Sequence, residues 1–504
     1  MILLRGKGAR ITSTLAVGAL LGAGIVGTAA AEPTAEPVEA GIHVPKIDDL
    51  REDFFMGADI STVISLEDSG VTFYNAAGEP DDLFDVLAEG GVNSVRLRVW
   101  NDPFDADGNG YGGGNIDVAR AVEIGERATA AGMSVLVNFH YSDFWADPGK
   151  WKEPKAWAGL SVDEKADALY DFTKDALEQF RDAGVDVAMV QVGNESNNGM
   201  AGVAASGDWT NIAKLYQAGS EAVREVLPEA KVALHFTNPE RGTFPGYANT
   251  LAARGVDYDV FAASYYPFWH GTLDNLTSTL STVATAHDKE VIVAEFSWAY
   301  TMEDGDSHDN VVKSGSNVSA YPVSVQGQAT ALHDVIEATH NVADGAGLGI
   351  YYWEPAWLPV GPPSELEANK RLWEEHGSGW AASYAGEFDA VDAGVWFGGS
   401  AWDNQALFDF AGHPHESLNT FKYVRTGTIT DRVPSRVQAV EVTVNSGDPV
   451  VLPSVVNVEY NDGTNEDQDV TWSDSVAWIR GAGVYQISGV TTAGVEVSAK
   501  VTVA

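Results

Sequence analysis

The sequence predicts an α/β fold, a (β/α)8 TIM barrel, followed by a small all-β sandwich. Between residues 55 and 355, short apolar runs alternate with amphipathic segments, which is typical of buried parallel strands joined by crossover helices. A doubly wound sheet is the rival fold, but no glycine-rich phosphate-binding loop follows the first run. From about residue 431 the chain changes to short Val- and Thr-rich runs separated by turns, which indicates a separate all-β domain.

Eight apolar runs are the predicted barrel strands. In chain order they are Phe55–Ile60, Val92–Trp100, Met133–Tyr141, Val187–Glu195, Lys231–Thr237, Tyr258–Pro267, Glu290–Trp298 and Leu348–Pro355. The amphipathic segments between them predict helices over Pro80–Glu89, Asp117–Ala131, Val162–Ala183, Trp209–Val226 and Gln326–Val342. Glycines stand where helices end before strands, as Gly132 and Gly184 do, which is a common helix C-cap arrangement. The tail predicts strands over Val437–Val444, Val450–Val458, Val484–Ile487 and Val495–Val503, with a hairpin turn at Asn461-Asp462-Gly463.

The first 31 residues have the pattern of a secretory signal peptide. Basic residues (Arg5, Lys7 and Arg10) precede an apolar stretch, and small residues follow it at Ala29-Ala30-Ala31. A membrane anchor is the alternative, but four glycines and the alanine-rich exit favour cleavage. We therefore expect a signal peptide over 1–31, a Pro/Glu-rich linker over 32–50, a barrel domain over 51–430 and the all-β domain over 431–504. The product is expected to be secreted, with possible association with the cell surface, and not to be inserted in the membrane after cleavage.

The charge of the chain limits its partners. The formal net charge is −42, so phosphate backbones and anionic membranes would be repelled, and a neutral substrate fits better than a polyanion. The chain has no cysteine, which excludes disulfides, thiol catalysis and cysteine-ligated metals. Walker, zinc-protease and serine-hydrolase motifs are also absent from the sequence.

Two glutamates stand at the ends of apolar predicted strands, where burying an ionised group costs free energy unless the group has a function. Glu195 ends Val190-Gln191-Val192-Gly193-Asn194-Glu195, and Glu295 ends Val291-Ile292-Val293-Ala294-Glu295. Catalytic groups of barrel enzymes lie at the carboxyl ends of the strands. Glycosidic hydrolysis needs two carboxyl groups, one protonated and one ionised. The pair therefore predicts a glycosidase, in which Asn194 can hydrogen-bond a sugar hydroxyl and His235 and Tyr266 adjust the pair.

These residues, with three further motifs, carry a resemblance. Gly57-Ala58-Asp59-Ile60-Ser61, Val95-Arg96-Leu97-Arg98-Val99-Trp100 and above all Asn138-Phe139-His140-Tyr141-Ser142-Asp143-Phe144-Trp145 resemble the endo-β-1,4-galactanases of glycoside hydrolase family 53. The resemblance implies that Glu195 is the acid/base, that Glu295 is the nucleophile, and that the anomeric configuration is retained. It implies a substrate of neutral plant β-1,4-galactan, cut within the chain to give galacto-oligosaccharides, and we expect a monomer. The tail, with Val456–Thr464, resembles bacterial immunoglobulin-like domains.

Aromatic residues at and beyond the strand ends are candidates for sugar stacking, because Trp offers the largest apolar face. Trp298 and Trp353 are expected near the cleaved bond, and Trp380 and Trp396 at outlying subsites. Asp143 is expected to bind sugar hydroxyls. His140 and Trp145 belong to the same motif and complete the predicted substrate-binding set.

An acidic loop after the seventh strand predicts a calcium site. Asp304, Asp306, His308 and Asn310 fall at alternate positions, a spacing with which a short loop can wrap a hard cation, with His308 using its carbonyl oxygen. The EF-hand pattern is not matched. Bacterial members of the family are similar in having such a loop, closed by residues after the eighth strand, which here would be Ser400 and Asp403. The calcium would be structural.

Two other functions stay open on the sequence. Another retaining (β/α)8 endo-glycanase, such as a β-mannanase, xylanase or β-glucanase, would share both glutamates, although the His140–Trp145 motif speaks against it. A carbohydrate-binding protein with an inactive barrel would be expected to lack Glu195 or Glu295, and both are present.

Overall fold

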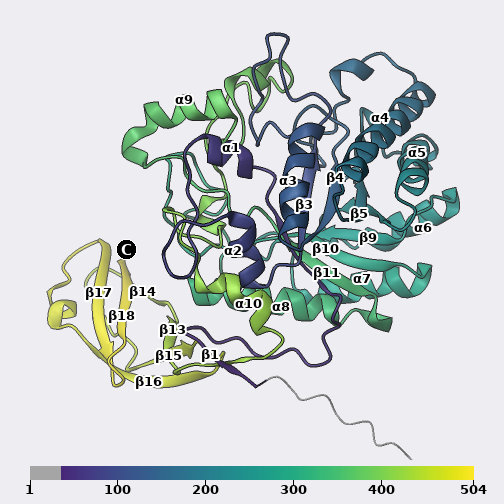
Figure 1. Cartoon of the computed structure of the whole chain (residues 1–504). Coiled ribbons are helices and arrows are strands. Elements are labelled where there is room, and N and C mark those ends of the chain that lie inside the picture. Colours follow the sequence, from purple (N-terminus) through teal and green to yellow (C-terminus); the bar gives the residue numbers. More distant parts are fainter. Residues whose placement is uncertain (1–35) are drawn as a thin grey trace, which may run out of the picture. The chain divides into compact units, whose positions relative to one another are not determined.

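The computed structural model describes residues 36–504, so the predicted signal peptide lies outside the described residues. Its centre is a closed barrel of parallel strands in the order β10-β11-β2-β3-β4-β5-β8-β9 (Figure 1). The strands are β2 (Phe55–Asp59), β3 (Ser94–Val99), β4 (Ser134–Phe139), β5 (Val187–Val192), β8 (Lys231–Phe236), β9 (Val260–Ser264), β10 (Glu290–Phe296) and β11 (Gly347–Tyr352). All eight predicted strands are present, which confirms the predicted barrel.

Helices lie outside the barrel strands (Figure 1). The five predicted helices are α2 (Leu83–Gly90), α3 (Val118–Ala130), α4 (Val162–Asp182), α5 (Thr210–Val226) and α8 (Val325–His340). The sequence did not predict α1 (Val63–Asp68), α6 (Phe244–Arg254), α7 (Leu273–His287), α9 (Leu366–His376) or α10 (Thr420–Tyr423). In α7, six Ser and Thr residues weaken both the helix propensity and the apolar pattern.

Side chains alternate between the barrel interior and the helix layer. In β3, Val95, Leu97 and Val99 pack in the large core that includes helix residues, whereas Arg96 and Arg98 occupy the other face. A smaller apolar core fills the lower part of the barrel and consists of Leu136, Met189, Ala233, Val260, Ala262, Ile292, Ala294, Leu348 and Tyr351. The next layer, toward the carboxyl ends of the strands, is polar.

The predicted linker needs correction over its described part. Residues 36–50 pack on the barrel body instead of forming a free spacer, because their apolar side chains are buried: Ile42, Val44 and Ile47. The short strand β1 (Val38–Glu39) also pairs in parallel with β12 (Thr428–Ile429), which follows the last barrel helix.

The C-terminal part contains six strands in the order β13-β15-β16-β17-β18-β14. They are β13 (Pro434–Val437), β14 (Val440–Val444), β15 (Val455–Tyr460), β16 (Asn465–Trp472), β17 (Gly483–Thr491) and β18 (Glu496–Val503). The predicted turn joins β15 to β16, where the Tyr460 amide donates to the Thr464 carbonyl at 2.8 Å and Gly463 has a φ of 74°. Over residues 36–504, none of the helices has the length and apolarity needed to span a bilayer.

Candidate active site

Five buried charges of alternating sign cross the mouth of the barrel. The Nη1 atom of Arg96 lies 2.9 Å from Asp59 and 3.1 Å from Glu295. The Nη1 atom of Arg98 lies 3.4 Å from the same Asp59 and 2.5 Å from Glu354. Buried charges are tolerated when they are paired in this way, so the two arginines allow three carboxylates in one polar layer. Asp59 and Arg96 thus support this polar layer.

Glu195 sits on a turn that is fixed to the neighbouring strand. After β5, Gly193 has a φ of 86° and Glu195 a φ of 40°, both in the left-handed region. The Ser196 amide donates to the His235 carbonyl at 3.0 Å, and the Asn197 side chain bonds both the amide and the carbonyl of Thr237. These bonds hold the strained turn in place and direct the Glu195 carboxyl group into the barrel mouth.

Glu295 reaches the same place because of a β-bulge. Ala294 faces the barrel interior, so strict alternation would turn Glu295 toward the helices. The register between β10 and β9 shifts between Val293 and Glu295, and the bulge re-aims the carboxyl group. Tyr266 Oη donates to Glu295 Oε2 at 3.1 Å.

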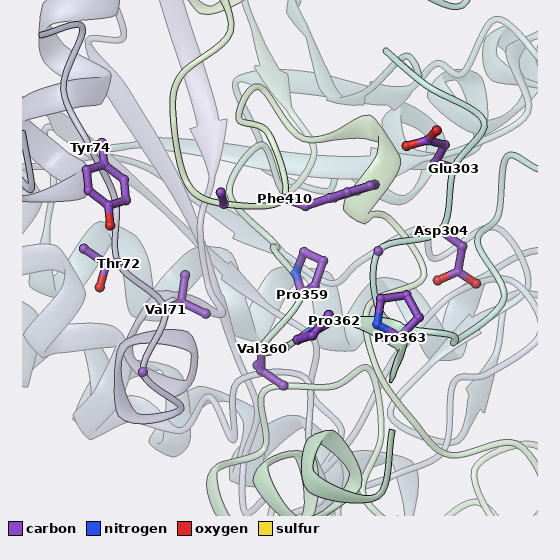
Figure 2. A pocket seen from close by; sticks show the side chains of 14 residues that line it. Val71, Thr72, Tyr74, Glu303, Asp304, Pro359, Val360, Pro362, Pro363 and Phe410 are labelled. Carbon is purple, nitrogen blue, oxygen red and sulfur yellow. The ribbon is translucent and has the colours of Figure 1, made fainter. Parts of the chain in front are cut away.

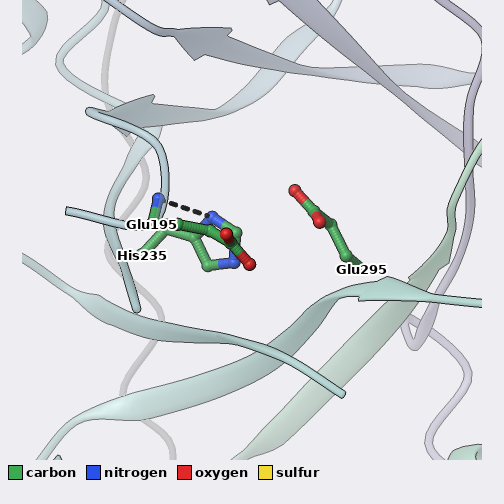
Figure 3. A group of neighbouring side chains, drawn as sticks. All are labelled: Glu195, His235 and Glu295. Atoms are coloured by element: carbon green, nitrogen blue, oxygen red, sulfur yellow. Dashed lines mark hydrogen bonds between the residues drawn. The ribbon is translucent and has the colours of Figure 1, made fainter. Parts of the chain in front are cut away.

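The two glutamates face each other across the mouth (Figure 3). One oxygen of each carboxyl group, together with a ring nitrogen of His235, lies within 4.8 Å of the others. Removal from water, and then repulsion from Glu295, raise the pKa of Glu195 to about 8. Burial also raises the pKa of Glu295, but Arg96 opposes this by favouring the ionised form. The environment therefore favours the protonated form of Glu195, while Arg96 favours the ionised form of Glu295, and acid-assisted displacement needs this combination.

A groove of about 590 Å³ lies over the pair. Its aromatic lining is Trp145, Tyr266, Trp269, Trp353, Trp357, Trp380 and Trp402, and Asn194, Glu195 and Glu295 lie among them. Trp353 Nε1 is buried and has no hydrogen-bond partner among the described residues, which leaves a donor for a hydroxyl group. The structure thus brings five other sequence-predicted residues around Glu195 and Glu295: Trp145, Asn194, Tyr266, Trp353 and Trp380.

Two of the predicted tryptophans do not line this groove. Trp298 is fully buried, and its indole Nε1 donates to the Pro322 carbonyl at 3.0 Å, so its faces are taken by core packing. Trp396 is 68% exposed and lies outside the lining. The expected place of Trp298 in the groove is therefore not found, whereas Trp353 is among the groove residues.

The two polar residues of the motif after the third strand also lie behind the groove. Asp143 is buried, and its carboxylate accepts the backbone amides of Asp102 at 3.0 Å and Lys155 at 2.7 Å, which fixes two loops. His140 is buried beside Trp100, whose Nε1 donates to His140 Nδ1 at 3.1 Å. Asp143 thus does not reach sugar hydroxyls in this arrangement, because its oxygens are turned to the backbone.

Trp269, Trp357 and Trp402 are aromatic groove residues that the sequence did not predict. Trp402 lies one residue before the predicted calcium ligand Asp403, and its ring centroid is 5.4 Å from that of Tyr266. Trp269 follows a predicted strand by two residues and is 54% exposed. The sequence could have indicated these residues by their positions, just beyond the end of a predicted strand or next to a predicted calcium ligand.

The predicted calcium loop gathers three carboxylates. Oxygens of Asp304, Asp306 and Asp403 lie within 4.8 Å of one another, and Asp306 and Asp403 are fully buried. Burial raises the pKa of Asp306 to about 7 and that of Asp403 well above its usual value, with Asp306 adding repulsion at Asp403. Buried Asn310 Oδ1 has no hydrogen-bond partner among residues 36–504. A cluster of acceptors with an unpartnered amide oxygen fits a hard cation.

The other predicted ligands take different positions. The Ser400 amide donates to Asp306 at 2.9 Å, while its hydroxyl donates to the Trp357 carbonyl at 3.1 Å. The His308 amide donates to Asp306 at 2.8 Å. A second cavity of about 590 Å³, lined by Tyr74, Pro359 and Phe410 among others, opens beside Asp304 (Figure 2). Solvent therefore reaches the edge of the cluster.

Comparisons with known proteins give two family matches along the chain. The model of glycosyl hydrolase family 53 matches residues 55–421, and that of the bacterial Ig-like domain (group 4) matches residues 437–495. The chain is 58% identical to an endo-beta-1,4-galactanase of Bacillus subtilis (strain 168), covering 77% of this chain and 90% of the relative. It is 34% identical to arabinogalactan endo-beta-1,4-galactanase A of Aspergillus niger, covering 60% and 85%.

Two solved structures support the same grouping. The GH53 catalytic domain of Ignisphaera aggregans superposes with a TM-score of 0.67 and 37% identity, covering 76% of this chain and 99% of that one. A structure from work on two fungal beta-1,4-galactanases gives a TM-score of 0.57 and 29% identity, covering 73% and 98%.

Proposed function

The chain belongs to glycosyl hydrolase family 53, and on this premise we propose that it is an endo-β-1,4-galactanase. Its substrate is the neutral β-1,4-galactan of type I arabinogalactan and pectin, which it cuts within the chain to release galacto-oligosaccharides. The observation that carries the proposal is the pair of carboxyl groups of Glu195 and Glu295, with oxygens within 4.8 Å, at the mouth of the barrel.

The first step uses both carboxyl groups at once. Protonated Glu195 gives its proton to the glycosidic oxygen as the bond from that oxygen to the anomeric carbon breaks. The ionised Glu295 attacks the anomeric carbon from the opposite face and forms a covalent galactosyl-enzyme ester. Tyr266 and Arg96 hold the Glu295 oxygens, and the short carboxyl separation suits this direct attack, whereas inverting enzymes keep about 6.5–9.5 Å for a water.

The second step reverses the roles. Ionised Glu195 removes a proton from a water molecule, the water oxygen bonds to the anomeric carbon, and the ester bond to Glu295 breaks. Glu195 is again protonated and Glu295 again ionised, so the enzyme is restored. Two inversions at one carbon retain the β configuration.

The groove and the surface charge suit an uncharged polymer. The aromatic lining offers apolar faces to galactose rings, and the net charge of −42 would repel a polyanionic chain.

The test is the release of reducing ends from β-1,4-galactan beside mannan, xylan and β-glucan. We expect release from galactan alone, with a rapid fall in polymer length and a β anomer as the first product by NMR. Release from another polymer would contradict the substrate, and an α anomer would contradict the mechanism. Glu195→Gln is the matched control, and it should lower kcat by about 10²- to 10⁴-fold because a general acid is lost.

Export is part of the same proposal. The signal-peptide pattern of residues 1–31 supports secretion, and the bacterial Ig-like domain supports a role as a spacer or an adhesion unit at the cell surface.

We further propose that Asp304, Asp306, Asp403 and Asn310 hold a structural calcium ion. The ion would supply positive charge to buried carboxylates and tie the loop after β10 to the segment after β11, since Asp403 also accepts the Gly305 amide at 3.0 Å. It takes no part in the chemical steps.

Removal of calcium should therefore lower thermal stability. We expect a chelator to decrease the Tm of the protein, added calcium to restore it, and Asp306→Asn to abolish the calcium response in calorimetry. Glu303→Gln, in the same loop but outside the cluster, should behave as the unaltered protein. An unchanged Tm after chelation, with no calcium found by elemental analysis, would contradict the proposal.

A further inference from the structure

Ser264, the last residue of β9, links the Glu195 carboxyl group to His235. Ser264 Oγ lies 2.5 Å from Glu195 Oε1 and 2.9 Å from His235 Nε2. The other ring nitrogen, His235 Nδ1, lies 3.4 Å from the backbone nitrogen of Glu195, the contact drawn in Figure 3. Ser264 and His235 are fully buried. The three residues therefore form a closed ring of hydrogen bonds that holds both ends of Glu195.

The proton positions in this ring follow from its partners. His235 Nδ1 faces two donors, the Glu195 amide at 3.4 Å and Gln191 Nε2 at 3.1 Å. A third neighbour, Asn194 Oδ1 at 3.0 Å, already accepts from Arg96 and Gln191, so Nδ1 acts as an acceptor. Burial, and then Arg96, hold the pKa of His235 well below its usual value, so the ring is neutral. Its single proton is on Nε2 and is donated to Ser264 Oγ. The hydroxyl proton of Ser264 is then donated to Glu195 Oε1.

This arrangement distinguishes the two oxygens of Glu195. Oε1 accepts from Ser264 whether the carboxyl group is ionised or neutral, because a carbonyl oxygen also accepts. The acidic proton is therefore carried by Oε2. We propose that Ser264, oriented by neutral His235, is a positioning residue for the acid/base Glu195, which it holds so that Oε2 exchanges the proton with the glycosidic oxygen and with water. This inference rests on the proposed function.

Other groups around Glu195 raise or lower its pKa. Glu295 on β10 and Asp147 in the loop after β4 raise the pKa of Glu195, whereas hydrogen bonds from Ser264 and Thr237 lower it. Removing the Ser264 hydroxyl therefore raises that pKa and frees the carboxyl group to rotate. Both effects weaken Glu195 as an acid but leave Glu295 unchanged.

The experiment separates acid assistance from general damage. Ser264→Ala is assayed on aryl β-1,4-galacto-oligosides with a good leaving group, 2,4-dinitrophenol, and a poor one, phenol. A good leaving group departs without a proton, so its kcat/KM should change little. For the phenyl substrate we expect kcat/KM to fall about ten- to a hundredfold. We also expect the basic limb of the pH profile of kcat/KM to move to higher pH by about one unit.

Two further variants complete the test. Ser264→Cys keeps the size of the side chain with a weaker donor, should give an intermediate effect, and replaces Ser264→Ala if that protein does not fold. Ser94→Ala removes another fully buried strand hydroxyl, which bonds the Ser134 carbonyl and Tyr351, and should leave both substrates unaffected.

The outcomes are distinct. An equal loss with both leaving groups, or an unchanged leaving-group dependence and pH profile in both Ser264 variants, would overturn the positioning role. An unaltered protein that cleaves neither galactan nor the aryl galacto-oligosides would overturn the proposed function instead.

Discussion

Replacing Glu295 by alanine will lower kcat on β-1,4-galactan by about 10⁴-fold or more, because the covalent step loses its nucleophile. The variant should still fold, since removing a carboxylate with a raised pKa takes away a buried charge. The measurement is reducing-sugar release by the purified variant, with circular dichroism to show that the fold is intact.

Azide distinguishes the roles of the two glutamates. In Glu295→Ala it can occupy the space of the lost carboxylate and attack an activated aryl galacto-oligoside, which gives an α-galactosyl azide by one inversion. In the matched variant Glu195→Ala, azide attacks the ester on Glu295, and two inversions give the β-azide. The opposite assignment of anomers would exchange the two roles and contradict the proposed mechanism.

Replacing Arg96 by methionine will lower the free energy of unfolding by about 3–5 kcal/mol, because buried carboxylates lose their partner. Arg96 contacts Asp59 and Glu295 through Nη1 and donates to Asn194 at 2.7 Å and Gln191 at 3.2 Å. Denaturant unfolding measures the loss. Arg120→Met is the matched control: Arg120 is partly exposed and lies 3.5 Å from Asp68, so the loss should be about 1 kcal/mol or less.

The loss in Arg96→Met should depend on pH in one direction. Without Arg96, the pKa of Glu295 in the folded protein rises further above its unfolded value. Such a group stabilises the fold below the unfolded pKa and loses that stabilisation as the pH rises through the folded pKa. The variant should therefore be closer to the unaltered protein at pH 5 than at pH 8, and an opposite trend would show that Arg96 does not favour ionised Glu295.

The barrel could be predicted because its strands are continuous apolar runs that end in polar residues. Helices α6 and α7 could not, since weak helix formers occupy them and packing against the barrel supplies most of their stability. The linker was misread for a similar reason. Its composition is dominated by prolines and glutamates, so the three isolated apolar residues Ile42, Val44 and Ile47 gave no recognisable pattern. These side chains are buried only against the surface of the folded barrel.

In the site, the two glutamates could be predicted because each is a charged residue at the end of an apolar strand. Which side chains lie beside them could not be predicted, because that depends on the geometry of the strands. Simple alternation places Ala294, Phe296 and Trp298 on one inward face. The bulge at Glu295 reverses the later positions, so Phe296 joins the outer core and Trp298 is buried with it. A bulge has no reliable sequence signal, and neither has the loop path that brings Trp402 to Tyr266.

The pairing of β1 with β12 has a mechanical consequence. The two strands are parallel, so tension that pulls the chain upstream of Val38 and downstream of Ile429 slides them in opposite directions. Their hydrogen bonds, Val38 amide to Gly427 carbonyl and Ala40 amide to Ile429 carbonyl, are then loaded in shear and must break together, instead of one at a time as in peeling. The paired strands β1 and β12 thus hold the two ends of the barrel domain together outside the active site. Tension along the chain strains this pair before it strains the groove.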